Sequence, residues 1–192
     1  MTPILGIIAS QITGHLVTNS YESIATVTVP SGGQSSISFN SIPSTYKHLQ
    51  IRGIARSANA AIAEQGKLQM NGDTSASNYA FHTLMGNGSA ASAAGYGTGV
   101  VAGVAGVFRI TANTAPANIF GVTVVDILDY TNTNKSKTVR ILTGQDQNGS
   151  GDVQFNSGLW LNTAAVTSLN FTMQGSGDFM QYSSFALYGI KG

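Results

Sequence analysis

The sequence predicts an all-β protein, an antiparallel β-sandwich of jelly-roll type with an extended N-terminal arm. Short segments in which apolar and polar residues alternate recur along most of the 192 residues, and such alternation is the pattern of a half-buried strand. Gly, Pro, Asn and Asp separate these segments at the close spacing typical of sandwiches and barrels. Strands nowhere alternate with amphipathic helical segments, which argues against a parallel α/β fold.

The first twenty residues differ from the rest and predict an arm, residues 1–20, ahead of a sandwich domain over residues 21–192. The arm contains no Lys, Arg, Asp or Glu and shows no strict alternation. One interpretation is a strand or short helix that covers the protein's own core, and the other is an arm that lies on a neighbouring subunit. In the second case the candidate partner-binding residues are Ile4, Leu5, Ile7, Ile8, Ile12 and Leu16.

Five strands are expected in the first half of the sandwich domain, each ended by a turn signal. In the first, Ser23–Val29, alternation places Ile24 and Val27 on opposite faces. The other four span Ser36–Phe39, Tyr46–Arg56, Lys67–Met70 and Tyr79–Met85.

Residues 89–106 are rich in Ala and Gly. A helix is disfavoured here, because each Gly costs roughly 1 kcal/mol relative to Ala inside a helix. The segment is therefore interpreted as a loop, or as a strand whose glycines let another backbone approach closely.

The second half shows clearer strands. Ile119–Tyr130 and Lys137–Gln145 are expected to pair as a hairpin. Asp126 and Asp129 are interpreted as one solvent-facing residue and one at the strand end, and a structural ion pair between Asp126 and Arg140 is the alternative. Asp126 and Asp129 lie three apart in the first of these strands and so point to opposite faces, which rules them out as an acid/base pair. The remaining strands are Val153–Leu161, Val166–Met173 and Met180–Ile190, which makes about ten strands in all.

The charge balance argues against two classes of partner. Charged residues make up 9% of the chain, and nine Lys and Arg against eight Asp and Glu leave a formal net charge of +1. Nucleic-acid binding needs a clustered positive field and electrostatic membrane binding needs a basic patch, so neither partner is expected. Near-zero net charge favours association with other protein surfaces. The chain has no cysteine, and no segment has the pattern of a signal peptide or a membrane-spanning helix.

No catalytic, cofactor-binding or metal-binding residue is expected. His15, His48 and His82 lack the spacing of a metal site and are interpreted as packed or surface residues. Residues 71–74 and 146–152 are rich in Asp, Asn and Gly. Plain turns are the first interpretation of both segments, and a calcium site is the alternative.

Aromatic residues within the expected strands include Trp160, Tyr130, Tyr182 and Tyr188. Packing in the core or at an interface is the simplest interpretation. A platform for sugar rings is the alternative, because exposed Trp and Tyr faces stack on pyranose rings. A shallow groove lined by Trp160 or by the tyrosines would favour that alternative.

Five stretches spread over the whole chain resemble one group of proteins. They read MTPILGIIASQITGHL, SIPSTYKHLQIRGIAR, DILDYTNTNKSKTVR, SGLWLNTAAVTSL and YSSFALYGIKG. In them the chain resembles small virion-associated structural proteins of tailed bacteriophages, including phages of marine and freshwater bacteria. The resemblance implies a place on the exterior of a phage particle and implies no mechanism, since these stretches carry no catalytic motif.

Composition and pattern predict a non-enzymatic all-β protein that associates with its neighbours. The resemblance implies that it is a virion structural protein, which decorates the capsid or forms part of a tail or fibre appendage. Its expected partners are other virion proteins and copies of itself, since a closed ring such as a trimer would hide exposed strand edges. The alternative is a carbohydrate- or host-receptor-binding module of a phage appendage. A glycan-active enzyme is the third hypothesis, and it would need a carboxylate pair that the sequence does not reveal.

Overall fold

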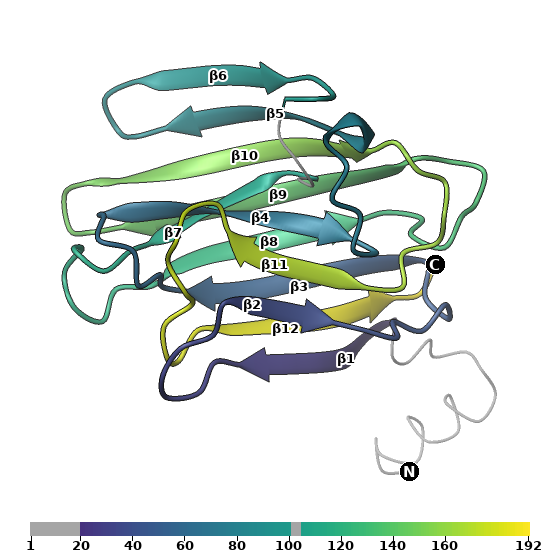
Figure 1. The fold of residues 1–192 in the computed structure, drawn as a ribbon, viewed down its shortest axis with the longest axis horizontal. Coiled ribbons are helices and arrows are strands. Elements are labelled where there is room, and N and C mark those ends of the chain that lie inside the picture. The colour runs from purple at the N-terminus through teal and green to yellow at the C-terminus, as the bar shows by residue number, and fades with distance from the viewer. Residues whose placement is uncertain (1–19, 101–104) are drawn as a thin grey trace, which may run out of the picture.

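The computed structural model of the chain describes residues 20–100 and 105–192. These residues form two antiparallel β-sheets packed face to face, which confirms the predicted β-sandwich (Figure 1). The strands are β1 (Tyr21–Thr28), β2 (Ser36–Phe39), β3 (His48–Ala55), β4 (Ala63–Met70), β5 (Tyr79–Gly86), β6 (Ala91–Tyr96), β7 (Val107–Thr111), β8 (Gly121–Ile127), β9 (Lys137–Asp146), β10 (Gly151–Trp160), β11 (Leu169–Met173) and β12 (Ser184–Ile190). Within the described ranges the helical content is a single 3-10 turn, η1 (Ala76–Asn78), and no helix there is long and apolar enough to span a membrane.

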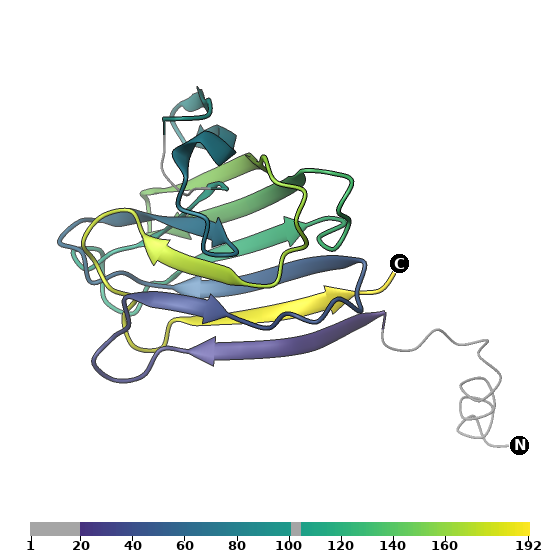
Figure 2. The ribbon, with the colours of Figure 1, turned by 45° about the vertical axis from the view of Figure 1, so that its right-hand side comes forward.

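The larger sheet has eight strands in the order β1-β12-β3-β8-β9-β10-β5-β6, and the smaller sheet has four in the order β2-β11-β4-β7. Most connections cross from one sheet to the other, so spatial neighbours come from distant parts of the sequence, as in a jelly roll. Figure 1 shows the larger sheet from β6 at the top to β1 at the bottom. The β5–β6 hairpin extends past the smaller sheet (Figure 2).

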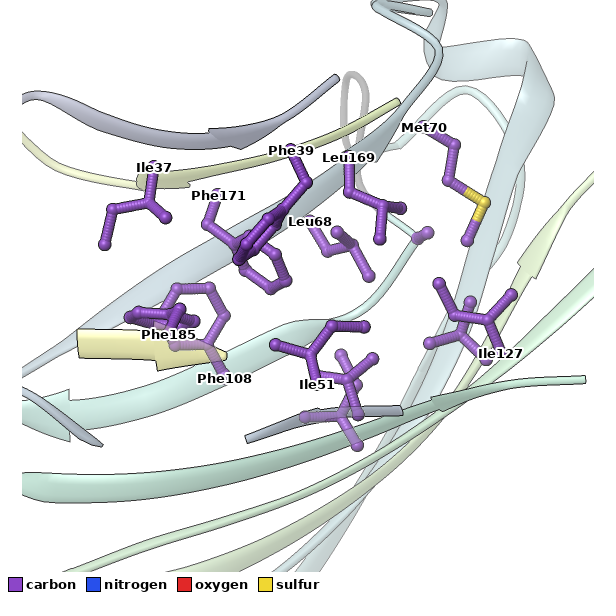
Figure 3. Packing of buried hydrophobic residues seen from close by; sticks show 14 of the residues in the cluster. Ile37, Phe39, Ile51, Leu68, Met70, Phe108, Ile127, Leu169, Phe171 and Phe185 are labelled. Carbon is purple, nitrogen blue, oxygen red and sulfur yellow. The ribbon is translucent and has the colours of Figure 1, made fainter. Parts of the chain in front are cut away.

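A continuous apolar core lies between the sheets (Figure 3). Its centre is aromatic, with the Phe171 and Phe185 ring centroids 5.0 Å apart and those of Phe108 and Phe185 6.0 Å apart. Gly66 on β4 makes room for this cluster, because a Cβ atom there would lie 2.0 Å from Cζ of Phe108. Burying each large apolar side chain contributes about 1.5–3 kcal/mol, so this layer supplies the main force that holds the sheets together.

The placement of Ile24 and Val27 on opposite faces of the first strand is wrong. The register of β1 against β12 shifts between Ser23 and Ala25, which marks a β-bulge. An extra residue in one strand reverses the alternation beyond it. Ile24 and Val27 therefore both pack against the core.

β7 and β8 also differ from the expectation, whereas β6 agrees with it. β7 was not predicted, because four of its five residues are buried and it shows no alternation. The Ala- and Gly-rich segment contains β6, which confirms the strand interpretation for Ala91–Tyr96 and leaves every residue of that strand exposed. The strand expected to reach Tyr130 ends at Ile127, because Asp129 has a left-handed backbone with φ of 48°.

Candidate interaction surface

The outer face of the larger sheet carries two neighbouring rows of mostly apolar residues. Alternation along β3, β8, β9, β10 and β5 sends every second residue to this face, and the register sets those residues side by side. The first row is Ile54, Val122, Gly144, Val153 and Gly86. The second row is Arg52, Val124, Leu142, Phe155 and Leu84. We define the outer apolar patch as Ile54, Val122, Val124, Leu142, Val153, Phe155 and Leu84.

This patch is open to solvent in the single chain. Six of its seven side chains are between 40% and 60% exposed, and Val124 is partly buried. Single exposed apolar residues are common on protein surfaces, whereas contiguous apolar patches of several hundred Å² mark interaction sites. The contiguity of the patch across five strands therefore identifies it as a candidate interface.

β10 is oriented with its apolar residues outward. Val153 and Phe155 face solvent, whereas Asp152, Gln154 and Asn156 are buried on the other side of the strand. Burial of apolar surface favours the opposite orientation. The outward side of β10 thus presents two apolar side chains that a partner would cover.

Buried hydrogen bonds fix β10 in this orientation. The Asp152 carboxylate accepts bonds from Nε of Arg109 at 2.6 Å and from Nε2 of Gln145 at 3.0 Å. Nε2 of Gln154 donates to Oγ1 of Thr83 at 2.7 Å. A one-residue shift of the strand would break these bonds and move every side chain to the other face.

A groove of about 590 Å³ opens at one end of the outer apolar patch. Gly144 lies between Val122 and Val153 and has no side chain to fill the space between them. Residues 149–152 of the β9–β10 turn and residues 86–88 form much of the rim. The groove is therefore a recess that an apolar side chain of a partner can enter.

A polar and aromatic flank adjoins the patch where β1, β12 and β3 lie together. The rings of Tyr21 and Tyr188 stack with centroids 4.8 Å apart, and the Arg52 guanidinium lies 5.6 Å from the Tyr21 centroid. The Tyr21 hydroxyl donates to Oε1 of Gln50 at 2.6 Å, and Nε2 of Gln50 donates to Oδ1 of Asp126 at 2.8 Å. These five residues are called the polar flank below.

Asp126 and Arg140 face each other across β8 and β9 in register, as the hairpin predicted. Among the described residues, however, no salt bridge joins them, so the alternative of an ion pair is wrong. The Asp126 carboxylate is hydrogen-bonded to Gln50. Arg140 is exposed, and its guanidinium is available to a partner at the border of the patch.

The predicted aromatic residues separate into two groups. Trp160 and Tyr130 are 1% and 0% exposed, so core packing is confirmed for both and a sugar groove lined by Trp160 is wrong. Tyr188 instead joins Tyr21, a residue that the sequence did not single out. Tyr182 is 70% exposed and lies outside β12.

The two oxygen-rich segments are turns with internal hydrogen bonds. Asp73 accepts from Nε1 of Trp160 and Nδ2 of Asn78, both at 2.8 Å. Burial raises the pKa of Asp73, but these two bonds and a third from the backbone N–H of Ser75 together outweigh it and hold that pKa below its usual value. In the second segment residues 147–150 join β9 to β10, and the Asp146 carboxylate accepts from the backbone N–H of Asn148. Within the described ranges no cluster of three or more His, Cys, Asp or Glu side chains is arranged to hold a metal.

The structure does not bring the predicted histidines together. His48 lies on β3 and His82 on β5, with three strands between them, or about 19 Å at 4.8 Å per strand. Nδ1 of His48 accepts a bond from the backbone N–H of Asp129 at 3.0 Å. His15 lies outside the described residues. The predicted partner-binding residues Ile4, Leu5, Ile7, Ile8, Ile12 and Leu16 also lie outside them.

Asp129 has a structural role in the β8–β9 connection. Its carboxylate bonds to Nζ of Lys135 at 2.6 Å and to Nζ of Lys47 at 3.0 Å. These two bonds lower the pKa of Asp129 to about 2. The placement of Asp129 inside a strand is wrong, since the strand ends at Ile127.

The outer face of the smaller sheet is polar, in contrast to the outer apolar patch. Oγ of Ser38 on β2 donates to Oδ1 of Asn170 on β11 at 2.8 Å, and Nδ2 of Asn170 reaches Oε1 of Gln69 on β4 at 3.5 Å. The residues that face outward on β2, β11 and β4 are Ser36, Ser38, Asn170, Thr172, Gln65, Lys67 and Gln69, together with Ala63. The two outer faces of the sandwich thus differ in chemistry.

One signal in the sequence could have revealed the patch. Consecutive apolar residues occur at Val124–Val125 and Ile141–Leu142. In each pair one residue is fully buried and the other faces outward. Apolar residues on both sides of a strand indicate a strand covered on both faces.

Comparison with known proteins yields distant similarity to solved structures alone. No protein-family model and no curated protein matches the chain. The marine PL-14 alginate lyase from Aplysia kurodai is similar over 95% of this chain and 92% of the lyase chain, at 12% sequence identity and a TM-score of 0.33. A TM-score this low carries no argument about activity.

Proposed function

We propose that this chain is a non-enzymatic structural protein of a tailed-phage particle, on the capsid or on a tail or fibre appendage, that binds its neighbours through the outer apolar patch. The setting comes from the resemblance in sequence. The mode of action comes from one observation, the exposed rows of apolar residues that run over five strands of the larger sheet. Covering such a surface supplies the driving force for protein association.

The orientation of β10 supports this proposal. A strand that directs Val153 and Phe155 to solvent and buries Asp152 is suited to a protein whose outer face is covered in use. The low charge content fits the same use, because few ionised groups must lose water when the surface is covered.

The test replaces Leu142 by Asp in the virus that encodes the chain and measures the amount of chain in purified particles. Leu142 is 52% exposed, so the substitution leaves the core intact, and a charge in the centre of the patch prevents close packing. We expect incorporation to fall at least ten-fold, which corresponds to about 1.4 kcal/mol of binding free energy.

Ile62→Asp is the matched control. Ile62 is 57% exposed, lies before β4 and is not one of the seven residues of the patch. Its substitution is expected to leave incorporation unchanged. Normal incorporation of the Leu142→Asp chain would refute attachment through the patch.

The polar flank favours a second candidate function, the binding of a carbohydrate or host receptor. A stacked pair of tyrosines beside Arg52 and Gln50 combines an aromatic surface with hydrogen-bonding groups, as sugar recognition requires. If this function holds, Tyr188→Ala abolishes retention of the chain on immobilised host surface polysaccharide, whereas Leu142→Asp does not. Equal retention of the Tyr188→Ala and unmodified chains would exclude the flank as the site.

A further inference from the structure

We propose that the outer apolar patch binds a second copy of this chain, in a two-fold pair whose axis runs along the strands between β8 and β9. This inference rests on the proposed function and names the partner. A two-fold pair uses one surface twice, so a single continuous patch is sufficient to form it. The trimer expected from the sequence would instead require two different complementary surfaces on each chain.

The size of the larger sheet matches such a pair. Eight strands at a spacing of about 4.8 Å span about 34 Å, and seven residues of strand span about 24 Å. The outer face therefore covers about 800 Å², which is the area that each partner contributes to a standard protein interface. The outer apolar patch occupies the middle of this face, with Gln50, Asp126 and Arg140 along one side, in the manner of an apolar core with a polar rim.

The register makes the face complementary to itself. Two residues that pair across β8 and β9 lie at the same height along the proposed axis. The two-fold rotation therefore places the β8 residue of one copy opposite the β9 residue of the other copy. Asp126 of one copy then meets Arg140 of the other, and this opposite-charge contact occurs twice. Val122 likewise meets Gly144, so that its side chain enters the groove.

The outer strands extend this complementarity. The same rotation places β3 against β10. Arg52 then lies opposite Phe155, where a guanidinium stacks on an aromatic ring, and Ile54 lies opposite Val153. The strand directions of two aligned sheets differ by up to about 30°, and such a rotation moves residues far from the axis the most. The proposed arrangement therefore specifies the contacts of β8 and β9, which are nearest the axis, more closely than those of the outer strands.

Sedimentation velocity of the full-length chain tests the pairing. At about 100 µM the unmodified chain and the Ile62→Asp control are expected to have the mass of two chains, and Leu142→Asp the mass of one. Thermal midpoints of the variants report that each chain is folded. A one-chain mass for the unmodified chain would overturn the inference, and so would a three-chain mass. If Leu142→Asp still prevents particle incorporation in either case, the proposed function survives and only the partner is wrong.

The N-terminal segment is the competing occupant of the patch. Replacing Ile7 and Ile8 by Asp in the full-length chain separates the two occupants, because the proposed pair is formed by residues of the larger sheet. We expect the double variant to remain a pair. A one-chain mass would assign the contact to residues 1–20 and overturn the face-to-face arrangement.

Charge reversal tests the position of the axis. Asp126→Arg and Arg140→Asp each place like charges opposite each other in the pair, so each variant alone is expected to dissociate at least ten-fold more readily than the unmodified chain. An equimolar mixture restores Arg against Asp at both contacts, and native mass spectrometry is expected to show mixed pairs. Failure of the mixture to pair, in a protein whose unmodified form does pair, would place the axis elsewhere and refute the arrangement proposed here.

Discussion

The two sheets of the sandwich each present one face to the outside, and the two faces are built differently. On the smaller sheet the outward positions hold side chains such as Ser38 and Asn170, which bond to each other. On the larger sheet the equivalent positions hold Leu142 and Phe155, which are 52% and 40% exposed. Strand propensity alone does not explain this contrast, because Ser, Thr, Asn and Gln occupy the outward positions of strands in the same protein.

The contrast shows that apolar residues serve two purposes in the larger sheet, since the inward ones pack in the core and the outward ones are available to a partner. Along β9, Ile141 packs in the core and Leu142 faces outward, although they are neighbours in the chain. Substitutions of inward residues are expected to change the free energy of unfolding, and substitutions of outward residues to change association. Four predictions test this separation.

The largest effect is expected from Ile141→Ala compared with Leu142→Ala. Ile141 is fully buried, so its truncation removes apolar contacts and leaves a cavity, at a cost of about 2–5 kcal/mol. Leu142→Ala is expected to change the free energy of unfolding by less than about 0.5 kcal/mol. The measurement is urea denaturation at a protein concentration below that at which copies associate. Equal losses for the two variants would contradict the separation of purposes.

Gly66→Ala compared with Gln65→Ala applies the same reasoning to the smaller sheet. The new methyl group at position 66 would overlap the Phe108 ring, and overpacking of a core costs about 1–3 kcal/mol. Gln65 faces outward, and its truncation is expected to cost less than about 0.5 kcal/mol. Thermal melts of the two variants provide the measurement. A Gly66→Ala chain as stable as the unmodified one would show that the Phe108 ring can move aside.

Ser38→Ala is expected to have a small effect on the polar outer face. It removes the bond to Asn170, which is exposed to water, so the free energy of unfolding falls by no more than about 1 kcal/mol. Particle incorporation and sedimentation are expected to stay unchanged. A loss of assembly would show that the smaller sheet also contacts a partner.

The smallest effect is expected from Asp129→Asn and depends on pH. The pKa of Asp129 is about 2 in the folded chain, whereas its ordinary value is 3.8. The ionised carboxylate therefore stabilises the fold above pH 3.8. This contribution is lost as the pH falls from 3.8 to about 2. The thermal midpoint of Asp129→Asn is therefore expected to lie slightly below that of the unmodified chain at pH 6, and the difference is expected to shrink as the pH falls through about 2. Asn tolerates the left-handed backbone at this position, which makes it a suitable replacement. A difference as large at pH 2 as at pH 6 would show that the two lysine bonds are not its cause.

Much of the sandwich could be predicted, because alternation and turn residues are local signals. β2 was predicted with its correct bounds, and β3, β5 and β9 to within a few residues. β7 could not be predicted in this way, since Arg109 alone interrupts its buried residues. The bulge in β1 could not be predicted either, because it depends on how β1 pairs with β12.

The interaction surface was harder to predict than the fold. Alternation in β10 shows that Val153 and Phe155 share a face, but it does not show whether that face is the core. Bonds to Arg109, Gln145 and Thr83, all distant in sequence or on other strands, decide the orientation. The stacking of Tyr21 on Tyr188 likewise requires the two ends of the chain to be neighbours.

The position of β12 between β1 and β3 determines the order in which the larger sheet can form during synthesis. Among the described strands, β1 is the first to be synthesised, and the strand next to it in the sheet is β12, the last of them. Until β12 is synthesised, the edge of β3 that pairs with it stays open. Contacts between the two ends of a chain also slow folding, because a long loop must close before they form. The nascent chain therefore carries an unpaired strand edge from the synthesis of β3 to that of β12.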